Sequence, residues 1–327
     1  EELALAEKVA LSSGTTHGLV ALTGDKFLLW SGSKQAFLMY QRTPRFWVAL
    51  GDPIGNADEF DQLIWQFRTL ADQHSAEVAF YEVSVQYLPS YIDLGMTLLK
   101  LGEEGRVDLT HFTLQGKKQG NLRNAMNKIE REGFTFEVLP KGQNAETIAK
   151  LKVVSDEWIE NKRAREKGFS LGFFDESYLS KTPIAIVKKD GEIYAFANVW
   201  HTDNFYELSI DLMRYRNDAP NGIMEYLMVS LMLWGKDSGY RWFNLGMAPL
   251  SGLEDHPLAP VWHKVGNTLF SYCNEFYNFE GLLQYKRKFN PDWQARYLAV
   301  PSGVKAPQVL MTVTLLIAGG LRGVFGK

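Results

Sequence analysis

The segment ELSIDLMRYRNDAPNGIMEYLMVSLMLW, residues 207–234, joins the pattern of a β-strand to the pattern of an apolar helix through a loop rich in Asn, Pro and Gly. In the expected strand, Leu208 and Leu212 fall on one face, and Ser209 and Asp211 fall on the other. A buried carboxylate without a partner is costly. The sequence therefore predicts that either a polar cavity or an ion pair meets Asp211.

The same order of elements occurs in both halves of the chain. In the first half, apolar runs separated by short turns predict a four-stranded meander, followed by the loop GDPIGNAD, a helix and a strand. The runs are 17–22, 26–30, 36–40 and 46–50, the helix is expected over 60–71, and the strand over 77–85. The second half offers a helix around 145–163, a hairpin turned by Asp190-Gly191, and then the opening segment, where Asn221 is expected to cap a buried helix. This repeated order indicates an internal duplication of the fold.

Composition describes a folded globular protein, with 46% hydrophobic and 22% charged residues in 327. A formal net charge of −3 excludes a generally basic protein that coats nucleic acid. The single cysteine, Cys273, reads as a small core residue, and His256 and His263 lack the spacing of metal ligands. We therefore expect neither a metal nor another cofactor.

One basic segment stands out, LQGKKQGNLRNAMNKIEREGF at 114–134. On a helix it has a polar face opposite an apolar one. The polar face holds Lys117, Asn121, Asn124, Lys128 and Arg131, and the apolar face holds Leu122, Ala125, Met126 and Ile129. The polar face is either a solvated surface, which we favour, or a patch that binds RNA or phosphate, whose cations would be Lys117, Lys118, Arg123, Lys128 and Arg131.

The ends of the chain predict a fragment of a longer protein, because the sequence starts without Met and has no signal or transit peptide. No apolar run reaches the roughly 20 residues of a membrane-spanning helix. The nearest, VLMTVTLLIA at 309–318, is compatible with a docked C-terminal helix and with a segment in a membrane interface.

Meander, loop, helix and strand is the plan of the GNAT acyltransferase fold, but neither RNDAPNG nor GDPIGNAD matches the Gly-rich loop that binds coenzyme A in that fold. The stretches GDKFLLW, GDPIG, FTLQGKKQGNLRNAMNKIEREGF, FSLGFF, SIDLMRY, APNGIMEYLM, FNLGMAPLSGL and LQYKRKFNPDWQARYLA resemble the C-terminal domain of the aminoacyl-phosphatidylglycerol synthases, the multiple peptide resistance factor family. The resemblance implies an α/β (α+β) fold of tandem GNAT-like units, each a mixed, mainly antiparallel sheet flanked by helices. The expected divisions are a first unit over 1–140 with the basic helix at about 115–133, a catalytic unit over 141–300, and an apolar segment over 301–327.

This family resemblance implies transfer of an aminoacyl group from aminoacyl-tRNA to a glycerol hydroxyl of phosphatidylglycerol, which changes membrane lipid charge and resistance to cationic antimicrobials. The implied partners are the aminoacyl-tRNA, the lipid and an N-terminal transmembrane flippase region of the same full-length chain. The fragment would be a cytoplasmic domain of a bacterial cell-membrane protein, with alanyl transfer favoured over lysyl transfer. The alternatives are a peptidoglycan-directed transferase that uses the same donor and a non-catalytic lipid-binding module.

Three charged residues are the expected catalytic set. Asp211 would accept a proton or hold the α-ammonium of the amino acid, unless it is a buried partner of Arg214. A β-bulge would bring Arg214 to the same cavity, where it would bind the lipid phosphate; the alternative is an ion pair at the strand end. The resemblance favours Lys286, in QYKRKFNPDW read as a strand, as a phosphate contact; the alternative, favoured for at least two of Lys286, Arg287 and Lys288, is a solvated cluster of cations.

The remaining expected site residues would bind substrate. Arg287 and Arg296 would add to the phosphate patch, and aromatic and Gly-rich segments would form the pocket walls. These wall residues are Phe169, Phe173, Ser209, Asn244 and Gly246. Asp52, at the equivalent place in the first half, is expected to be structural.

Overall fold

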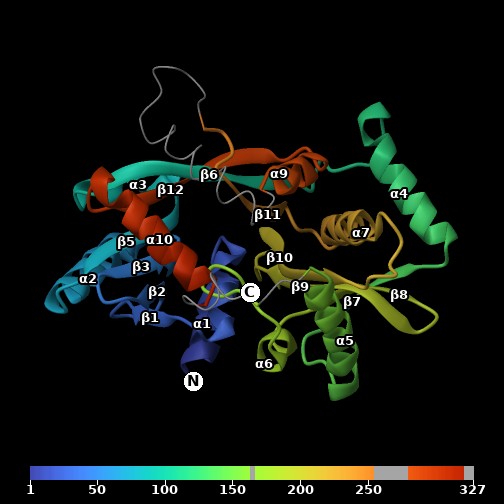
Figure 1. The fold of residues 1–327 in the computed structure, drawn as a ribbon, viewed down its shortest axis with the longest axis horizontal. Helices are drawn as coiled ribbons and strands as arrows, with labels where there is room; N and C mark the ends of the chain where they lie inside the picture. The colour runs from blue at the N-terminus through green and yellow to red at the C-terminus, as the bar shows by residue number, and fades with distance from the viewer. Residues whose placement is uncertain (163–165, 254–278, 320–327) are drawn as a thin grey trace. The chain divides into compact units, whose positions relative to one another are not determined.

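The computed structural model describes residues 1–162, 166–253 and 279–319 (Figure 1). The chain forms two compact units, each assembled from separate segments of sequence. Unit 1 comprises residues 1–25, 108–243 and the chain from 317, and unit 2 comprises 26–107 and 244–316. These units do not follow the expected division at 140/141, for a reason that lies in the strand order of unit 2.

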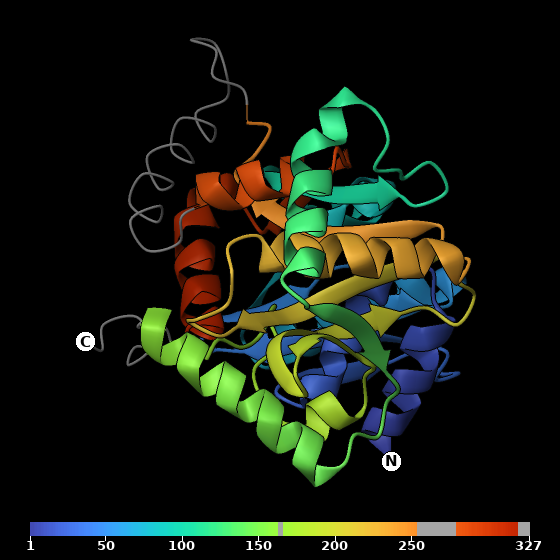
Figure 2. The same ribbon diagram turned by 90° about the vertical axis from the view of Figure 1, so that its right-hand side faces the viewer.

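Unit 1 is built on the antiparallel strands β7 to β10, in the order β10–β9–β8–β7. Helices α5 and α7 pack on opposite sides of these strands, and α4 packs on α7 (Figure 2). Its elements are α1 (Glu2–Ser12), η1 (Thr16–Thr23), η4 (Lys117–Gln119), α4 (Gly120–Arg131), β7 (Thr135–Leu139), α5 (Ala145–Lys162), α6 (Glu176–Ser180), β8 (Ile184–Lys189), β9 (Glu192–His201), β10 (Glu207–Tyr215) and α7 (Ile223–Asp237).

The opening segment folds as its pattern predicts, into β10 followed by the buried helix α7. The predicted hairpin is also confirmed, because Asp190 (φ 52°) and Gly191 (φ 83°) both adopt the left-handed conformation of a type I′ turn. The expected cap is wrong: Gly222, at φ 99°, precedes α7, and no side chain caps the helix.

Residues 17–22 are not the expected first strand of a meander but part of the 3-10 helix η1. The Glu207 carboxylate accepts hydrogen bonds from the backbone N–H and the hydroxyl of Thr16, at 2.9 and 2.8 Å. Thr15 caps the helix by accepting a hydrogen bond from the N–H of His17. These contacts satisfy the N–H groups of Thr16 and His17, the first two residues of the 3-10 helix.

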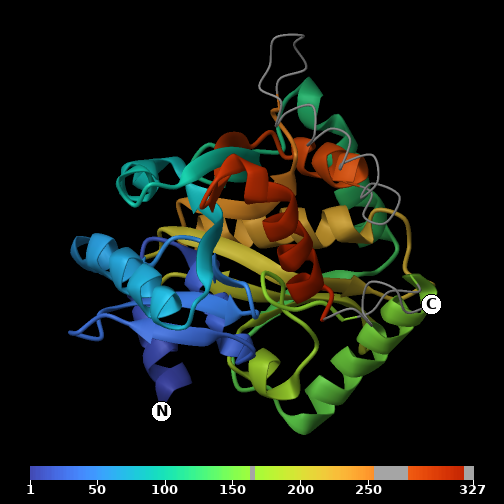
Figure 3. The same ribbon diagram turned by 60° about the vertical axis from the view of Figure 1, so that its left-hand side comes forward.

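Unit 2 holds the order β1–β2–β3–β5–β12–β6, with β11 next to β6 and the two-residue β4 paired with β2. Helix α2 packs against these strands (Figure 3). Its elements are β1 (Phe27–Trp30), β2 (Ala36–Arg42), β3 (Phe46–Leu50), β4 (Ile54–Gly55), η2 (Ala57–Glu59), α2 (Phe60–Gln73), β5 (Glu77–Ser84), η3 (Val85–Tyr87), α3 (Leu88–Asp93), β6 (Thr97–Asp108), β11 (Trp242–Pro249), which enters from unit 1, α9 (Phe279–Arg287), β12 (Asp292–Val300), η5 (Gly303–Lys305) and α10 (Ala306–Ile317).

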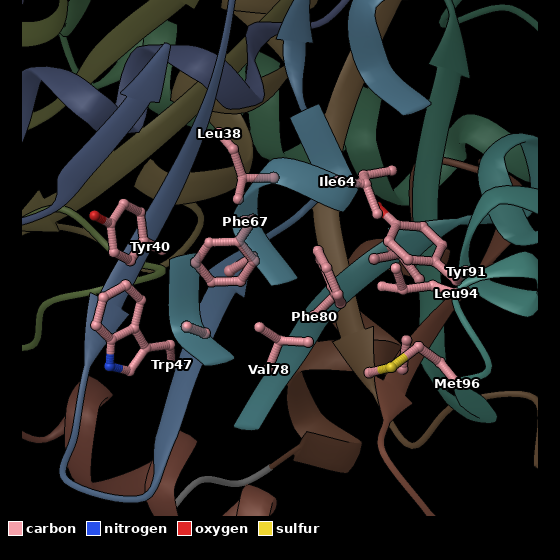
Figure 4. Packing of buried hydrophobic residues seen from close by; sticks show 14 of the residues in the cluster. Leu38, Tyr40, Trp47, Ile64, Phe67, Val78, Phe80, Tyr91, Leu94 and Met96 are labelled. Carbon is pink, nitrogen blue, oxygen red and sulfur yellow. The ribbon is translucent and has the colours of Figure 1, made fainter. Parts of the chain in front are cut away.

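Aromatic rings dominate the core of unit 2 (Figure 4). Tyr40 stacks on Trp47 with ring centroids 5.6 Å apart, and Phe67 meets both Tyr40 and Phe80 edge-on. Such pairs add to the stabilisation that burial of the apolar rings supplies. The helical spacing of α2 places Phe67 in this core, as its sequence predicts.

The strands of unit 2 confirm the expected fold class. Strand β3 pairs with β5 in parallel through the crossover helix α2, and the pairs β1–β2, β2–β3, β5–β12 and β6–β12 are antiparallel. This is the GNAT plan of meander, helix and parallel strand. Strand β12 pairs with both β5 and β6, so a strand from the end of the chain completes the sheet of the first half, and a boundary in sequence cannot separate the units.

The strand expected over 284–293 is wrong, because helix α9 continues through Arg287. Asn290 then adopts the left-handed conformation (φ 51°), Pro291 follows, and β12 begins only at Asp292. The alternation of Lys286 and Lys288 on one strand face therefore does not exist.

The C-terminal helix α10 buries Ala306, Val309 and Val313, and leaves Met311 exposed. Within the described ranges, no helix has both the length and the apolar character needed to cross a bilayer.

Candidate active site

Asp211 lies at an irregularity in β10, where the pairing with β9 shifts register between Ile210 and Met213. The predicted bulge is therefore confirmed. One carboxylate oxygen of Asp211 accepts a hydrogen bond from the N–H of Gly172 at 2.9 Å, and the other accepts one from the hydroxyl of Tyr178 at 2.7 Å. A Cβ atom on Gly172 would lie 1.7 Å from the Asp211 carboxylate, so only glycine allows this approach.

The hydroxyl of Tyr178 connects Asp211 to β9. It accepts hydrogen bonds from Asn198 Nδ2 at 3.0 Å and from Trp200 Nε1 at 2.9 Å, and donates its own proton to Asp211. Burial, followed by the charge of Asp211, raises the pKa of Tyr178 well above its ordinary value, so the phenol remains a donor. Asn198 Oδ1 accepts a hydrogen bond from the N–H of Leu212 at 2.7 Å, which satisfies a backbone group at the bulge.

Arg214 lies three residues further along β10 and is 4% exposed. Its guanidinium donates two hydrogen bonds to the Glu166 carboxylate, at 2.8 and 2.6 Å, and one to the Ser155 hydroxyl, and it lies over the ring of Trp158. The alternative of an ion pair at the strand end is thus the arrangement in the structure. Its carboxylate partner is Glu166, and binding of a lipid phosphate by Arg214 would first require this pair to separate.

Asp211 and Arg214 both bind the segment 166–172, one through Gly172 and the other through Glu166. Phe169, in this segment, is 2% exposed, has φ 59°, and donates its backbone N–H to Asp25 at 2.8 Å. It is therefore a core residue rather than an open pocket wall. Phe173, which follows Gly172, is half-buried.

Ser209, on the same strand as Asp211, is also buried. Its hydroxyl donates to the carbonyl oxygen of Ile210 at 3.4 Å. This contact places the side chain against its own backbone.

A second group of expected residues meets within unit 2. Lys286 is 7% exposed, and its ammonium donates to the carbonyl oxygen of Met247 at 2.7 Å. It lies against Gly246 (φ 74°), whose N–H donates to Asn244 Oδ1 at 2.7 Å. The structure therefore brings Lys286, Asn244 and Gly246 together, whereas Arg287 is exposed on α9.

Arg296 joins the same group through two carboxylates that the sequence did not single out, buried Glu104 and half-buried Glu82. It forms an ion pair with Glu104, and Glu82 lies within electrostatic range of both Arg296 and Lys286. Burial raises the pKa of Glu82 to about 7, which Arg296 opposes. Burial lowers the pKa of Lys286 to about 8, which Glu104 and Glu82 oppose.

Asp52 has the structural contacts that were expected of it. It accepts hydrogen bonds from the N–H of Ser84 at 2.9 Å and from the hydroxyl of Tyr91 at 2.8 Å. Burial raises its pKa. The pattern repeats that of Asp211, with one backbone N–H and one tyrosine hydroxyl on each carboxylate.

The basic helix has the predicted polarity, with Leu122, Met126 and Ile129 of α4 buried. Lys117, Lys128 and Arg131 are exposed. Arg123 instead donates to the carbonyl oxygens of Leu114 and Gly116, so its charge serves the turn before the helix. The Lys118 side chain lies outside the described part of the structure.

In the part of the chain that the structure describes, no group of three or more His, Cys, Asp or Glu side chains is arranged to hold a metal ion. His256, His263 and Cys273 lie outside the described residues.

The plan of meander, crossover helix and parallel strand, seen in β1 to β5, is typical of the GNAT-like acyltransferase fold. The chain belongs to the family described as "Phosphatidylglycerol lysyltransferase, C-terminal", whose model matches residues 7–300. It is 42% identical over 306 residues to the phosphatidylglycerol lysyltransferase of Bacillus subtilis strain 168, covering 93% of this chain and 35% of that protein. The chain thus spans about a third of the length of such curated relatives.

Two solved structures extend this likeness. One is described as the C-terminal domain of a lysylphosphatidylglycerol synthetase from Agrobacterium fabrum, with 41% identity, a TM-score of 0.89 and 98% of each chain covered. The other, L-PGS from Bacillus licheniformis, has 40% identity and a TM-score of 0.85 over 95% of this chain and 96% of that one. These similarities confirm the family resemblance inferred from the motifs.

Proposed function

We propose that this chain transfers a lysyl group from lysyl-tRNA to a glycerol hydroxyl of phosphatidylglycerol. The observation that carries the proposal is the Asp211 carboxylate, fixed at the bulge of β10 by Gly172 and Tyr178 in a chain whose relatives are named phosphatidylglycerol lysyltransferase. The reaction exchanges one ester for another, so the energy enters when the tRNA is charged.

Asp211 binds the α-ammonium of the amino acid in this proposal. An ionised carboxylate is an acceptor of hydrogen bonds and carries the charge that complements an ammonium. Because those donors come from a backbone amide and a fully buried tyrosine, the carboxylate is oriented before the substrate arrives. Holding the ammonium in a fixed place brings the adjacent ester carbonyl into line for attack.

Lysine replaces alanine as the favoured amino acid. The preference for alanyl transfer had no residue to support it, whereas the curated relatives with 35–42% identity are named lysyltransferases. The ester chemistry is the same for either amino acid. The choice affects only the part of the site that meets the side chain.

Exposed cations supply the contacts to the two anionic partners. Lys128 and Arg131 are exposed on α4 and Lys117 is exposed on η4 just before it, and these cations suit the phosphates of tRNA. Arg287, exposed on α9, suits the phosphate of the lipid. Since the chain spans a third of its relatives, we assign the membrane region to the remainder of the full-length protein.

The test is a transfer assay with phosphatidylglycerol in micelles and tRNA charged with labelled lysine or labelled alanine. We expect lysine label in the organic phase, with loss of the signal after RNase treatment. Phosphatidic acid, which lacks the second glycerol, is the matched acceptor control and should receive no label. Absence of transfer by both this chain and its full-length protein would refute the proposal, and transfer of alanine alone would refute its choice of amino acid.

A further inference from the structure

The segment 166–172 of unit 1 is tied to β10 at both of its ends. Glu166, its first residue, and Gly172, its last, bind side chains of β10 that lie three positions apart. Between them, the N–H of Leu171 donates to the carbonyl oxygen of Gly168 at 3.3 Å, which closes a turn. The turn brings the two ends of the segment back to the same strand.

Both of these contacts lie on the face of the sheet that α5 covers. Arg214 donates to the hydroxyl of Ser155 on α5, and Asp211 accepts a hydrogen bond from Tyr178 on α6. Helix α5 contacts both β10 and α6, whereas α7 packs on the opposite side (Figure 2). Asp211, which holds the α-ammonium in the proposed function, therefore shares this face with the ion pair of Arg214 and Glu166.

The Glu166 carboxylate is held by Arg214 and still accessible. Each of its oxygens accepts one hydrogen bond from the guanidinium, at 2.8 and 2.6 Å, although an oxygen of an ionised carboxylate has two lone pairs. The Glu166 side chain is 34% exposed, whereas that of Arg214 is buried. The guanidinium also lies over the ring of Trp158, so it is fixed in place. A cation that arrives from solvent therefore meets the carboxylate before it meets Arg214.

The carboxylates of Asp25 and Asp175 lie beside the same segment, but both hold backbone groups. Asp25 accepts a hydrogen bond from the N–H of Phe169 at 2.8 Å, and Asp175 caps α6 by accepting one from the N–H of Tyr178 at 2.8 Å. An ammonium at either carboxylate would compete with a hydrogen bond that holds the fold. Glu166, by contrast, binds a side chain.

We propose that Glu166 binds the side-chain ammonium of the lysyl group while Asp211 binds its α-ammonium. This inference rests on the proposed function and names the residue that selects lysine. A lysyl side chain is a flexible four-carbon stem that ends in an ammonium with three donors, so it can extend from one carboxylate toward a second on the same face. Arg214 is a positioning residue, because it fixes Glu166 without touching the amino acid. Alanine has no group for Glu166 to bind.

The experiment measures transfer from one tRNA charged with lysine or with Nε-acetyllysine, which keeps the stem and lacks the charge. We expect kcat/KM of the wild type to be about 10-fold higher for lysine, the value of a hydrogen bond to a charged group. Glu166→Gln should remove this preference. Glu157→Gln is the matched control, because Glu157 is a carboxylate of the same unit that pairs with Arg216, and it should keep the wild-type ratio. Since both substrates meet the same enzyme preparation, the ratio does not depend on how much of a variant is folded.

A second variant removes the risk of misfolding. Glu166→Gln leaves Arg214 buried without a charged partner, whereas Glu166→Gln combined with Arg214→Gln leaves no unpaired charge there. The double variant should also lose the preference for lysine. A wild-type ratio near one, the wild-type ratio in either variant, or an equal change in the control would overturn the inference. Each of these results leaves lysyl transfer by the wild type intact, whereas failure of the wild type to transfer lysine contradicts the proposed function itself.

Discussion

Replacement of Tyr178 by Phe removes a single oxygen atom on which three hydrogen bonds meet. The hydroxyl donates to Asp211 at 2.7 Å and accepts from Asn198 at 3.0 Å and from Trp200 at 2.9 Å. Tyr178 is fully buried, so solvent cannot easily take the place of the hydroxyl. A buried polar group left without its partner costs about 1–3 kcal/mol. Loss of the hydroxyl leaves three groups without this partner, and relaxation around them offsets part of their summed cost. We therefore expect Tyr178→Phe to lower the free energy of unfolding by about 3–5 kcal/mol.

Urea denaturation at pH 7 measures this loss. The control is Tyr194→Phe in the same sheet, because the Tyr194 ring packs on Phe134 and its hydroxyl makes no hydrogen bond with the described residues. The control should stay within about 0.5 kcal/mol of the wild type. A loss below about 1 kcal/mol for Tyr178→Phe, or an equal loss for the control, would refute the reasoning that this hydroxyl anchors Asp211.

Three further predictions concern neighbouring groups. Gly172→Ala places a methyl group 1.7 Å from the present position of Asp211 Oδ2, so the carboxylate must move. When kcat/KM for transfer and the free energy of unfolding are both measured, the loss in kcat/KM, expressed as a free energy, should exceed the loss in the free energy of unfolding. Glu166→Gln leaves the buried Arg214 fork without its charged partner and should lower the free energy of unfolding by about 3 kcal/mol, to be measured by urea denaturation. Burial holds the pKa of Glu82 at about 7 in the folded state against an ordinary 4.5, so the stability that this group contributes is fully present below pH 4.5 and lost as pH rises through 7. Glu82→Gln has no carboxyl group to titrate and so avoids this loss. Its free energy of unfolding, relative to that of the wild type, should rise by about 1–3 kcal/mol between pH 4.5 and 8, whereas equal pH dependence of the two proteins would contradict the assigned burial.

The sequence predicted elements whose signals are local. The period of β10, the apolar run of α7 and the Asp190-Gly191 turn each act within a few residues, and each is present in the structure. The strand predicted over 17–22 is wrong because a short apolar run suits a strand or a helix equally. The contact that decides between them comes from Glu207, far along the chain. The units of the structure differ from the predicted division for a similar reason. Strand β12 pairs with β5 and β6, which lie far back in the sequence.

The candidate site shows the same limit. A carboxylate in an alternating strand drew attention to Asp211, and the bulge beside it was foreseen. The sequence did not predict the carboxylate partner of Arg214, because Glu166 lies in an irregular segment that periodicity does not place. Glu82 carries the same signal as Asp211, a carboxylate inside a largely apolar strand, and the sequence analysis did not single it out.

In the mechanism that we propose, Asp211 holds the amino acid during transfer to the lipid. This role is measured by kcat/KM for lysyl transfer by Asp211→Asn, which keeps the shape of the side chain and removes its charge, with Asp156→Asn on the exposed face of α5 as control. We expect a loss of about 10- to 100-fold in Asp211→Asn, the value of a hydrogen bond to a charged group, with the control unchanged. Transfer by Asp211→Asn at the rate of the wild type would contradict it.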